Sequence, residues 1–96
     1  MSKQTQQTES PWVVGEAYFI RTVTYHYTGR LVAVTDRELV FTDAAWIPDS
    51  GRFSQFLLSG KAAEVEPYPD NARVILGREC VIDGVQFVHP LPRGVV

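Results

Sequence analysis

The sequence predicts a mainly β fold, a small bent antiparallel sheet or partly open barrel with one short α-helix. Three observations support this fold class. The chain has 96 residues, which is enough for one small core and no second domain. About six or seven short runs are rich in β-branched and aromatic residues, as strands are. A single stretch near the middle spaces its apolar residues as a helix does.

The first eleven residues differ in composition from the rest of the chain. Residues 1–11 read MSKQTQQTESP and consist mostly of Gln, Thr and Ser, which cannot join an apolar core. We therefore expect a flexible N-terminal arm over 1–11 and a single small barrel-like domain over 12–96. An alternative is that the arm becomes ordered against a neighbouring subunit.

The first half of the domain has the composition of β-strands. Residues 17–28 form one run of β-branched and aromatic residues in which neither face is fully polar, so we expect both faces to be partly covered. Residues 31–34 and 39–41 are further expected strands. The four residues 35–38 between them have the composition of a tight hairpin turn.

A helix is expected near residues 50–59. Pro48 should stop the preceding strand, and Asp49 or Ser50 can cap the helix N-terminus. Gly60 suits a left-handed C-terminal residue. The expected apolar face consists of three residues at helical spacing: Phe53, Phe56 and Leu57. Because so short a helix is unstable alone, it should dock on the sheet or on a neighbour.

The second half returns to short strands, expected over residues 62–66, 73–76, 79–82 and 85–88. The cluster Pro67–Asn71 is typical of a turn. Asp83-Gly84 lies between two apolar runs and predicts a β-hairpin, because a type I′ turn needs positive φ at both central residues. Cys80 is expected to be a small core residue.

Composition and charge narrow the class of protein. The hydrophobic fraction is 45% and the charged fraction 21%, which is ordinary for a globular protein. One cysteine excludes an intrachain disulfide. No apolar run approaches the ~20 residues of a membrane span. A net charge of −2 argues against a large phosphate-binding surface. We therefore expect a cytoplasmic protein with no membrane partner, for which nucleic acid is an unlikely ligand.

Residues 29–43 resemble the first signature of the Sm/LSm family of small SH3-like barrels, which has a glycine, an aspartate seven residues later and an apolar third strand. Five positions match it: Gly29, Leu31, Asp36, Leu39 and Phe41. Residues 74–81, around Gly77, resemble its second signature. The resemblance implies a barrel that forms rings. The chain also resembles small uncharacterised bacterial and phage-associated proteins.

The RNA-binding residues of the Sm/LSm family do not match. Leu39 stands where the family has an asparagine, and Leu76 stands where it has an arginine. Arg78 follows the second-signature glycine instead. A predicted helix also separates the two signatures. The resemblance therefore does not extend to RNA binding.

The sequence predicts no catalytic, cofactor-binding or metal-binding residues. His26, His89 and Cys80 are the side chains best suited to nucleophilic or acid–base chemistry, but they are far apart in the sequence. No phosphate-binding loop, nucleophile elbow or Cys-x-x-Cys motif is present. An enzyme is the third hypothesis, and it would require a polar cluster around His26 or Cys80.

The chain is instead rich in residues that interfaces favour. Arginine outnumbers lysine seven to two, and large aromatic residues are frequent. The alternative is that about half of these aromatic residues pack the core. The candidate interface residues are Trp12, Tyr18, Tyr25, Tyr27, Trp46, Phe53, Tyr68, Arg78 and Arg93.

We therefore expect a non-enzymatic structural or assembly protein. It would self-associate through edge strands as a homo-oligomer, or dock onto a protein partner in a larger complex, such as a virion, tail or shell. The alternative is an RNA- or small-ligand-binding module that uses the strand aromatics and Arg78, with bases stacked on tyrosines and contacted by arginine.

Overall fold

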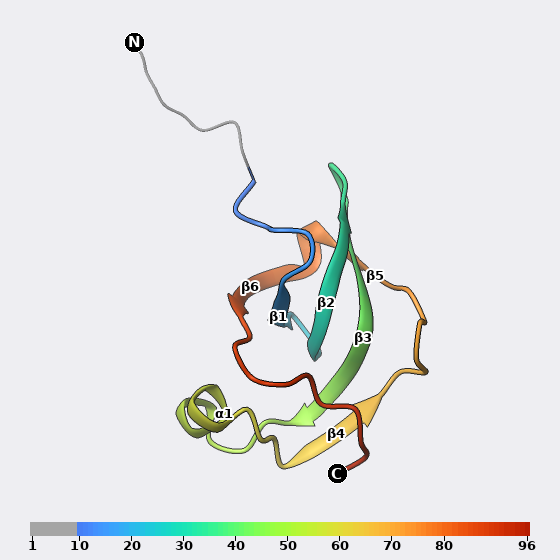
Figure 1. Ribbon diagram of the computed structural model, residues 1–96. Helices are drawn as coiled ribbons and strands as arrows, with labels where there is room; N and C mark the ends of the chain where they lie inside the picture. Colours follow the sequence, from blue (N-terminus) through green and yellow to red (C-terminus); the bar gives the residue numbers. More distant parts are fainter. Residues whose placement is uncertain (1–9) are drawn as a thin grey trace.

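The computed structural model describes residues 10–96 and has one antiparallel sheet with one short helix (Figure 1). Nine residues of the predicted arm, 1–9, lie outside the described residues. The strands are β1 (Ala17–Thr22), β2 (His26–Val34), β3 (Glu38–Asp49), β4 (Glu64–Pro67), β5 (Val74–Gly77) and β6 (Val81–Gln86). The helix α1 spans Phe53–Ser59, and a 3₁₀ turn, Arg78–Cys80, joins β5 to β6.

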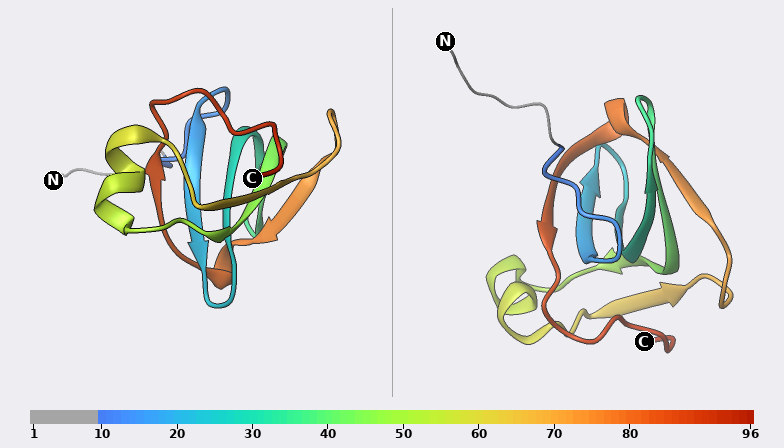
Figure 2. Two further views of the ribbon diagram at one scale, coloured as in Figure 1. Left: turned by 90° about the horizontal axis from the view of Figure 1, so that it is seen from below. Right: turned by 45° about the horizontal axis from the view of Figure 1, so that its top comes forward.

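The strand order is β4-β3-β2-β1-β6, and β5 also pairs with β3. One side of β3 pairs with β2, and its other side pairs first with β5 and then with β4. The strands curl around a common interior without closing into a barrel (Figure 2). The predicted fold class is confirmed: a bent antiparallel sheet with one short helix.

A β-bulge in the middle of β3 bends that strand. Asp43 has a positive φ of 50°. Thr28 faces Ala45 across the ladder, whereas Arg30 faces Thr42, so β3 has one extra residue at this point. An extra residue reverses which side chains face which side of the sheet. The strand continues through the bulge well beyond the predicted segment 39–41, and it includes Pro48, which was expected to stop it.

The buried residues form two clusters. The strand cluster consists of Tyr18, Ile20, Leu31, Leu39, Phe41, Ala44 and Val74. The helix cluster consists of Ala17, Phe19, Ala45, Ile47, Phe56, Val65 and Phe87. Successive residues of β1 alternate between the two clusters, as the period of two requires. Both faces of this strand are therefore covered, as its apolar composition predicted.

The helix is shorter than predicted, and its N-terminal cap differs. Its N-cap residue is Arg52, which makes no side-chain capping bond. The Asp49 carboxylate instead accepts a hydrogen bond of 2.8 Å from the Gly51 backbone N–H, before the helix begins. The C-terminal prediction is confirmed, because Gly60 has φ 74° and its N–H donates to the Phe56 carbonyl. Fully buried Phe56 fixes the helix to the sheet.

The predicted single strand over 17–28 is a hairpin of two strands. The chain reverses between Thr22 and Tyr25, where the Thr22 N–H donates to the Tyr25 carbonyl at 2.8 Å. The Thr22 hydroxyl also donates to that carbonyl and accepts from the Tyr25 N–H. A threonine side chain therefore closes a turn that contains no glycine, proline or asparagine. The predicted 35–38 turn is confirmed by a hydrogen bond from the Thr35 N–H to the Glu38 carbonyl.

The hairpin predicted at Asp83-Gly84 is wrong. β6 passes straight through both residues and pairs with β1. Asp83 forms an ion pair with Arg21 on that neighbouring strand. Gly84 is required for close packing, because a Cβ there would lie 2.6 Å from the Trp12 ring and 2.8 Å from the Ile20 Cδ1. Cys80, expected in the core, is exposed in the 3₁₀ turn that precedes this strand.

The C-terminal residues lie beside β4 (Figure 1). The backbone of Val96 makes two hydrogen bonds with Val65, each 3.1 Å long. These two hydrogen bonds use the backbone N–H and carbonyl of Val65, on the side of β4 that faces away from β3. This part of the sheet edge is therefore not open to another chain.

Replacing Gly84 with alanine should destabilise the fold by about 1–3 kcal/mol, because the new methyl group must displace the Trp12 ring or Ile20. Denaturant unfolding would measure this loss. Gly94→Ala is the matched control, since nothing lies within 4 Å of its Cβ position. Equal unfolding free energies for the two variants would contradict this account of Gly84.

Candidate functional site

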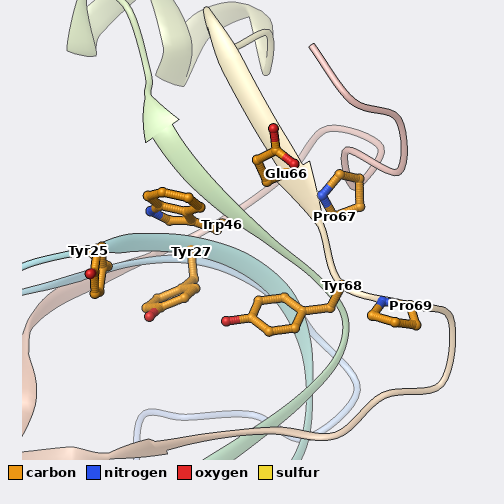
Figure 3. A pocket seen from close by; sticks show the side chains of 7 residues that line it. All are labelled: Tyr25, Tyr27, Trp46, Glu66, Pro67, Tyr68 and Pro69. Atoms are coloured by element: carbon orange, nitrogen blue, oxygen red, sulfur yellow. The ribbon is translucent and has the colours of Figure 1, made fainter.

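Four of the nine candidate interface residues line one surface groove: Tyr25, Tyr27, Trp46 and Tyr68 (Figure 3). The other lining residues are Glu66, Pro67 and Pro69. The volume of the groove is about 390 Å³, and it is open to solvent. We call this hollow, with its seven lining residues, the aromatic groove.

The pairing register of β2, β3 and β4 aligns three residues in the middle of the groove. Tyr27 of β2 lies opposite Trp46 of β3, and Trp46 lies opposite Glu66 of β4. Directly opposed residues place their side chains on the same face of a sheet. Three neighbouring strands therefore supply a tyrosine, a tryptophan and a carboxylate in one row.

The hairpin turn places Tyr25 beside this row. Tyr25 is held by the backbone and hydroxyl of Thr22. Its ring contacts that of Trp46 edge to face, with centroids 5.5 Å apart and planes at 85°. The Tyr25 and Tyr27 rings are 6.4 Å apart. Tyr25 is 49% exposed and Trp46 36% exposed, so both rings remain accessible to a partner.

A set of hydrogen bonds to one carbonyl positions Tyr68. The Ala44 carbonyl accepts from the Tyr68 N–H at 2.9 Å and from the Arg93 guanidinium at 2.8 Å. The same guanidinium donates to the Tyr68 carbonyl and to the Asp70 carboxylate. The Tyr68 ring consequently lies 6.5 Å from that of Tyr27 and extends the row of aromatic rings.

The electrostatic character of the groove is mildly acidic. Its lining includes Glu66 and no lysine or arginine. Within residues 10–96, Glu66 has no ion-pair partner. The pKa of Tyr27 is raised above the ordinary tyrosine value, first because partial burial disfavours the phenolate and then because Tyr68 and Tyr25 lie close by. The groove therefore favours the neutral form of the Tyr27 phenol, and its lining holds one carboxylate.

A second, smaller hollow of about 250 Å³ adjoins the groove. Tyr25 and Tyr27 line both hollows. The second hollow is otherwise lined by residues from the β1–β2 turn and from β5 and the 3₁₀ turn, which are Thr22, Val23, Thr24, Ile75, Leu76, Gly77 and Cys80. The two hollows therefore share these two tyrosines as lining residues.

The remaining candidate interface residues have other positions. Tyr18 is buried in the strand cluster, and the Trp12 ring packs against it with centroids 5.0 Å apart. Tyr18 is therefore a core residue, and the prediction that it lies at an interface is wrong. Phe53 is half exposed on the helix and lies under the Arg21 guanidinium. Arg78 donates to the Thr35 carbonyl at 2.6 Å.

The sequence analysis missed three lining residues, Glu66, Pro67 and Pro69. The cluster Pro67–Asn71 was predicted only as a turn, and it does turn, with Asn71 at φ 67°. The alternation of Pro and Tyr after Glu66 is the signal that was available. Prolines beside aromatic residues make a rigid apolar wall, since proline has little freedom to lose on binding.

The residues suited to catalysis are dispersed in the structure. His89 Nε2 lies 2.9 Å from the Leu57 carbonyl, and the His26 ring packs against Phe19. Neither histidine lines either hollow. Within residues 10–96, no three His, Cys, Asp or Glu side chains gather to hold a metal ion. No helix in this range is long and apolar enough to cross a membrane.

Tyr27 should ionise at a higher pH than an ordinary tyrosine, because the folded protein favours its neutral phenol. The stability that this preference contributes is fully present below pH 10.0, the ordinary value, and is lost as the pH rises through the raised pKa. The difference in phenolate absorbance between the wild type and Tyr27→Phe isolates this titration. A midpoint at or below the ordinary value would contradict the partial burial of Tyr27 as the cause of its raised pKa.

Comparisons of the chain with protein-family models, curated proteins and solved structures found no match. The Sm/LSm resemblance therefore stays a prediction. The structure buries Leu39 completely and packs partly buried Leu76 against the strand cluster. These are the two positions at which the Sm/LSm family contacts RNA, so here they serve the core.

Proposed function

We propose that this protein is a non-enzymatic docking module that binds a protein partner through the aromatic groove. The observation that carries the proposal is the convergence of Tyr25, Tyr27, Trp46 and Tyr68 on one accessible surface. Tyrosine and tryptophan bury a large apolar area at a small entropic cost and still offer a polar group. They are for this reason the commonest anchors of protein interfaces.

The chemistry of the groove supports a protein partner over nucleic acid. A nucleic-acid site combines aromatic rings with basic side chains that neutralise phosphates. The groove instead presents the Glu66 carboxylate and no basic side chain. Arg78, the arginine that the RNA alternative uses, already donates to the Thr35 carbonyl. Repulsion between Glu66 and phosphate therefore disfavours the RNA alternative.

The same lining supports binding over catalysis. Acid–base or nucleophilic chemistry needs a second polar group within hydrogen-bond distance of the first. Glu66 is the one carboxylate that lines the groove, and no histidine, cysteine, serine or lysine lies beside it in this lining. A partner that buries these rings would gain the energy of apolar contact without any reaction.

Selection from a displayed library of random peptides tests the docking proposal. The wild type should enrich a family of related peptides, and Tyr25→Ala should lose them, because half-exposed Tyr25 contributes to binding and little to the core. Phe53→Ala is the matched control, since Phe53 is a similarly exposed ring on the helix.

Failure to enrich any peptide that depends on Tyr25 would overturn the docking proposal. Binding of a single-stranded RNA oligonucleotide that is lost in Tyr25→Ala and weakens steeply with salt would favour the RNA alternative.

Self-association through an edge strand is a second candidate function, and the position of β6 supports it. Within residues 10–96, β6 pairs with β1 and with no other strand. Exposed Ile82 and Val85 lie on this strand. An apolar edge strand with unpaired backbone groups is a template for pairing with another chain. The predicted setting in a virion, tail or shell stays a prediction.

Light scattering at two protein concentrations tests self-association. We expect the wild type to form a defined oligomer and Ile82→Lys to be monomeric, because a lysine on an edge strand opposes pairing. Tyr25→Ala should retain the oligomer, since Tyr25 lies in the turn between β1 and β2 and not on β6. A monomeric wild type at both concentrations would overturn edge-strand self-association.

A further inference from the structure

We propose that the aromatic groove binds an N-methylated lysine side chain of a protein partner. This inference rests on the proposed docking function and names the chemistry of the group that enters the groove. Three observations carry it: four aromatic rings line one hollow, a carboxylate lies among them, and no lysine or arginine of residues 10–96 belongs to the lining.

The aromatic rings lie on more than one side of the groove. Figure 3 shows Trp46 and Glu66 on one side of the hollow and the Tyr27 and Tyr68 rings on the other. The planes of Tyr27 and Tyr68 are inclined by 39°, and the plane of Tyr25 stands at 85° to that of Trp46. Rings inclined in this way do not cover one another as stacked rings do. A cation in the hollow is therefore close to several rings and is attracted by each of them.

A contrast within the molecule supports a cationic ligand. The half-exposed Phe53 ring on the helix has a cation of its own chain, because the Arg21 guanidinium carbon lies 4.7 Å from the ring centroid. The groove has four rings, and its lining within residues 10–96 contains no lysine or arginine. A cation supplied by a partner would provide the groove with the interaction that Phe53 already makes within the chain.

The carboxylate of Glu66 gives the groove the charge that attracts a cation. Glu66 is exposed on β4, and Glu64 lies two residues earlier on the same strand. Alternate residues of a strand share a face, so both carboxylates lie on one side of β4. Their combined negative potential attracts a positively charged ligand to this side of the sheet.

The small number of hydrogen-bond acceptors favours a methylated ammonium over an unmodified one. A lysine ammonium carries three N–H donors and is strongly hydrated, so it needs acceptors to replace the water that it loses. Six of the seven lining residues are aromatic or proline, and Glu66 is the one carboxylate. A trimethylated ammonium keeps the positive charge, has no N–H to satisfy and presents methyl groups to the rings.

The adjoining hollow can accommodate the residues that flank the lysine. Tyr25 and Tyr27 line both hollows, and the second hollow adds the exposed side chains of Val23 and Ile75. A free ammonium compound in the groove would leave these apolar side chains uncovered. A peptide bound through its lysine would cover them as well, which favours a protein partner as the source of the cation.

NMR titration with three forms of one peptide tests this inference. The peptide has valine on both sides of one central residue, which is trimethyllysine, lysine, or the neutral isostere of trimethyllysine with carbon in place of the nitrogen. We expect the wild type to bind the trimethyllysine peptide about tenfold more tightly than the neutral isostere, because the charged form alone gains cation–π attraction. The lysine peptide should bind more weakly than the trimethyllysine peptide.

The indole N–H signals of the two tryptophans report where the peptide binds. Trp46 lines the groove, whereas Trp12 packs against Tyr18 and lines neither hollow. The Trp46 signal, assigned with Trp46→Phe, should shift during the titration, and the Trp12 signal should not. Tyr25→Ala should bind the trimethyllysine peptide about tenfold more weakly, as loss of an aromatic anchor does. Phe53→Ala should bind it as the wild type does.

Two charge variants on one strand test the contribution of Glu66. Glu66→Gln should weaken binding of the trimethyllysine peptide by up to about fivefold, the range of an exposed ion pair. Glu64→Gln is the matched control, because it changes the net charge equally but lies outside the lining of the groove. Equal losses in the two variants would overturn a direct contact between Glu66 and the cation.

The outcomes separate this inference from the docking proposal. Binding of none of the three peptides, while library selection yields Tyr25-dependent peptides without a basic residue, would overturn the inference and leave the docking function standing. Equal affinity for the neutral isostere would overturn the cation, and equal affinity for unmodified lysine would overturn its methylation. Tetramethylammonium binding as tightly as the trimethyllysine peptide would overturn a protein side chain as the source of the cation.

Discussion

The β-bulge at Asp43 is the constraint on which the rest of the structure depends. Before it, Leu39 and Phe41 face the strand cluster; after it, Ala45 faces the helix cluster. Continued alternation from Phe41 would have placed Ala45 in the strand cluster and turned Trp46 towards the helix. One extra residue with positive φ therefore directs apolar side chains to the helix and the tryptophan to the groove.

The Ala44 carbonyl, beside the bulge, links the C-terminal segment to the groove. It accepts from the Tyr68 N–H and from Arg93, and Arg93 also holds the Tyr68 carbonyl. An arginine suits this position because its planar group donates in several directions at once. The sequence analysis assigned Arg93 to an interface with a partner. In the structure it acts within the chain and fixes one wall of the groove.

The fold class and most turns were predictable from the sequence because local chemistry decides them. The 35–38 turn and the Gly60 helix end are examples. The Asp83-Gly84 hairpin was mispredicted because tertiary packing of Trp12, distant in sequence, requires a small residue there. The groove aromatics were identified one by one. Their convergence depends on the register of three strands and on the bulge, which composition and periodicity do not encode.

Exposed rings in a chain this small need an explanation beyond folding. A short chain buries a limited fraction of its surface, so each large apolar side chain placed inside stabilises it measurably. Phe19 and Phe56 contribute in this way, with almost no exposure. Tyr25 and Trp46 remain accessible, although their rings are as large. These two rings contribute little to the core. The strand register and the hydrogen bonds of the turn hold them in place and so maintain a preorganised surface. A preorganised surface lowers the entropic cost of binding a partner.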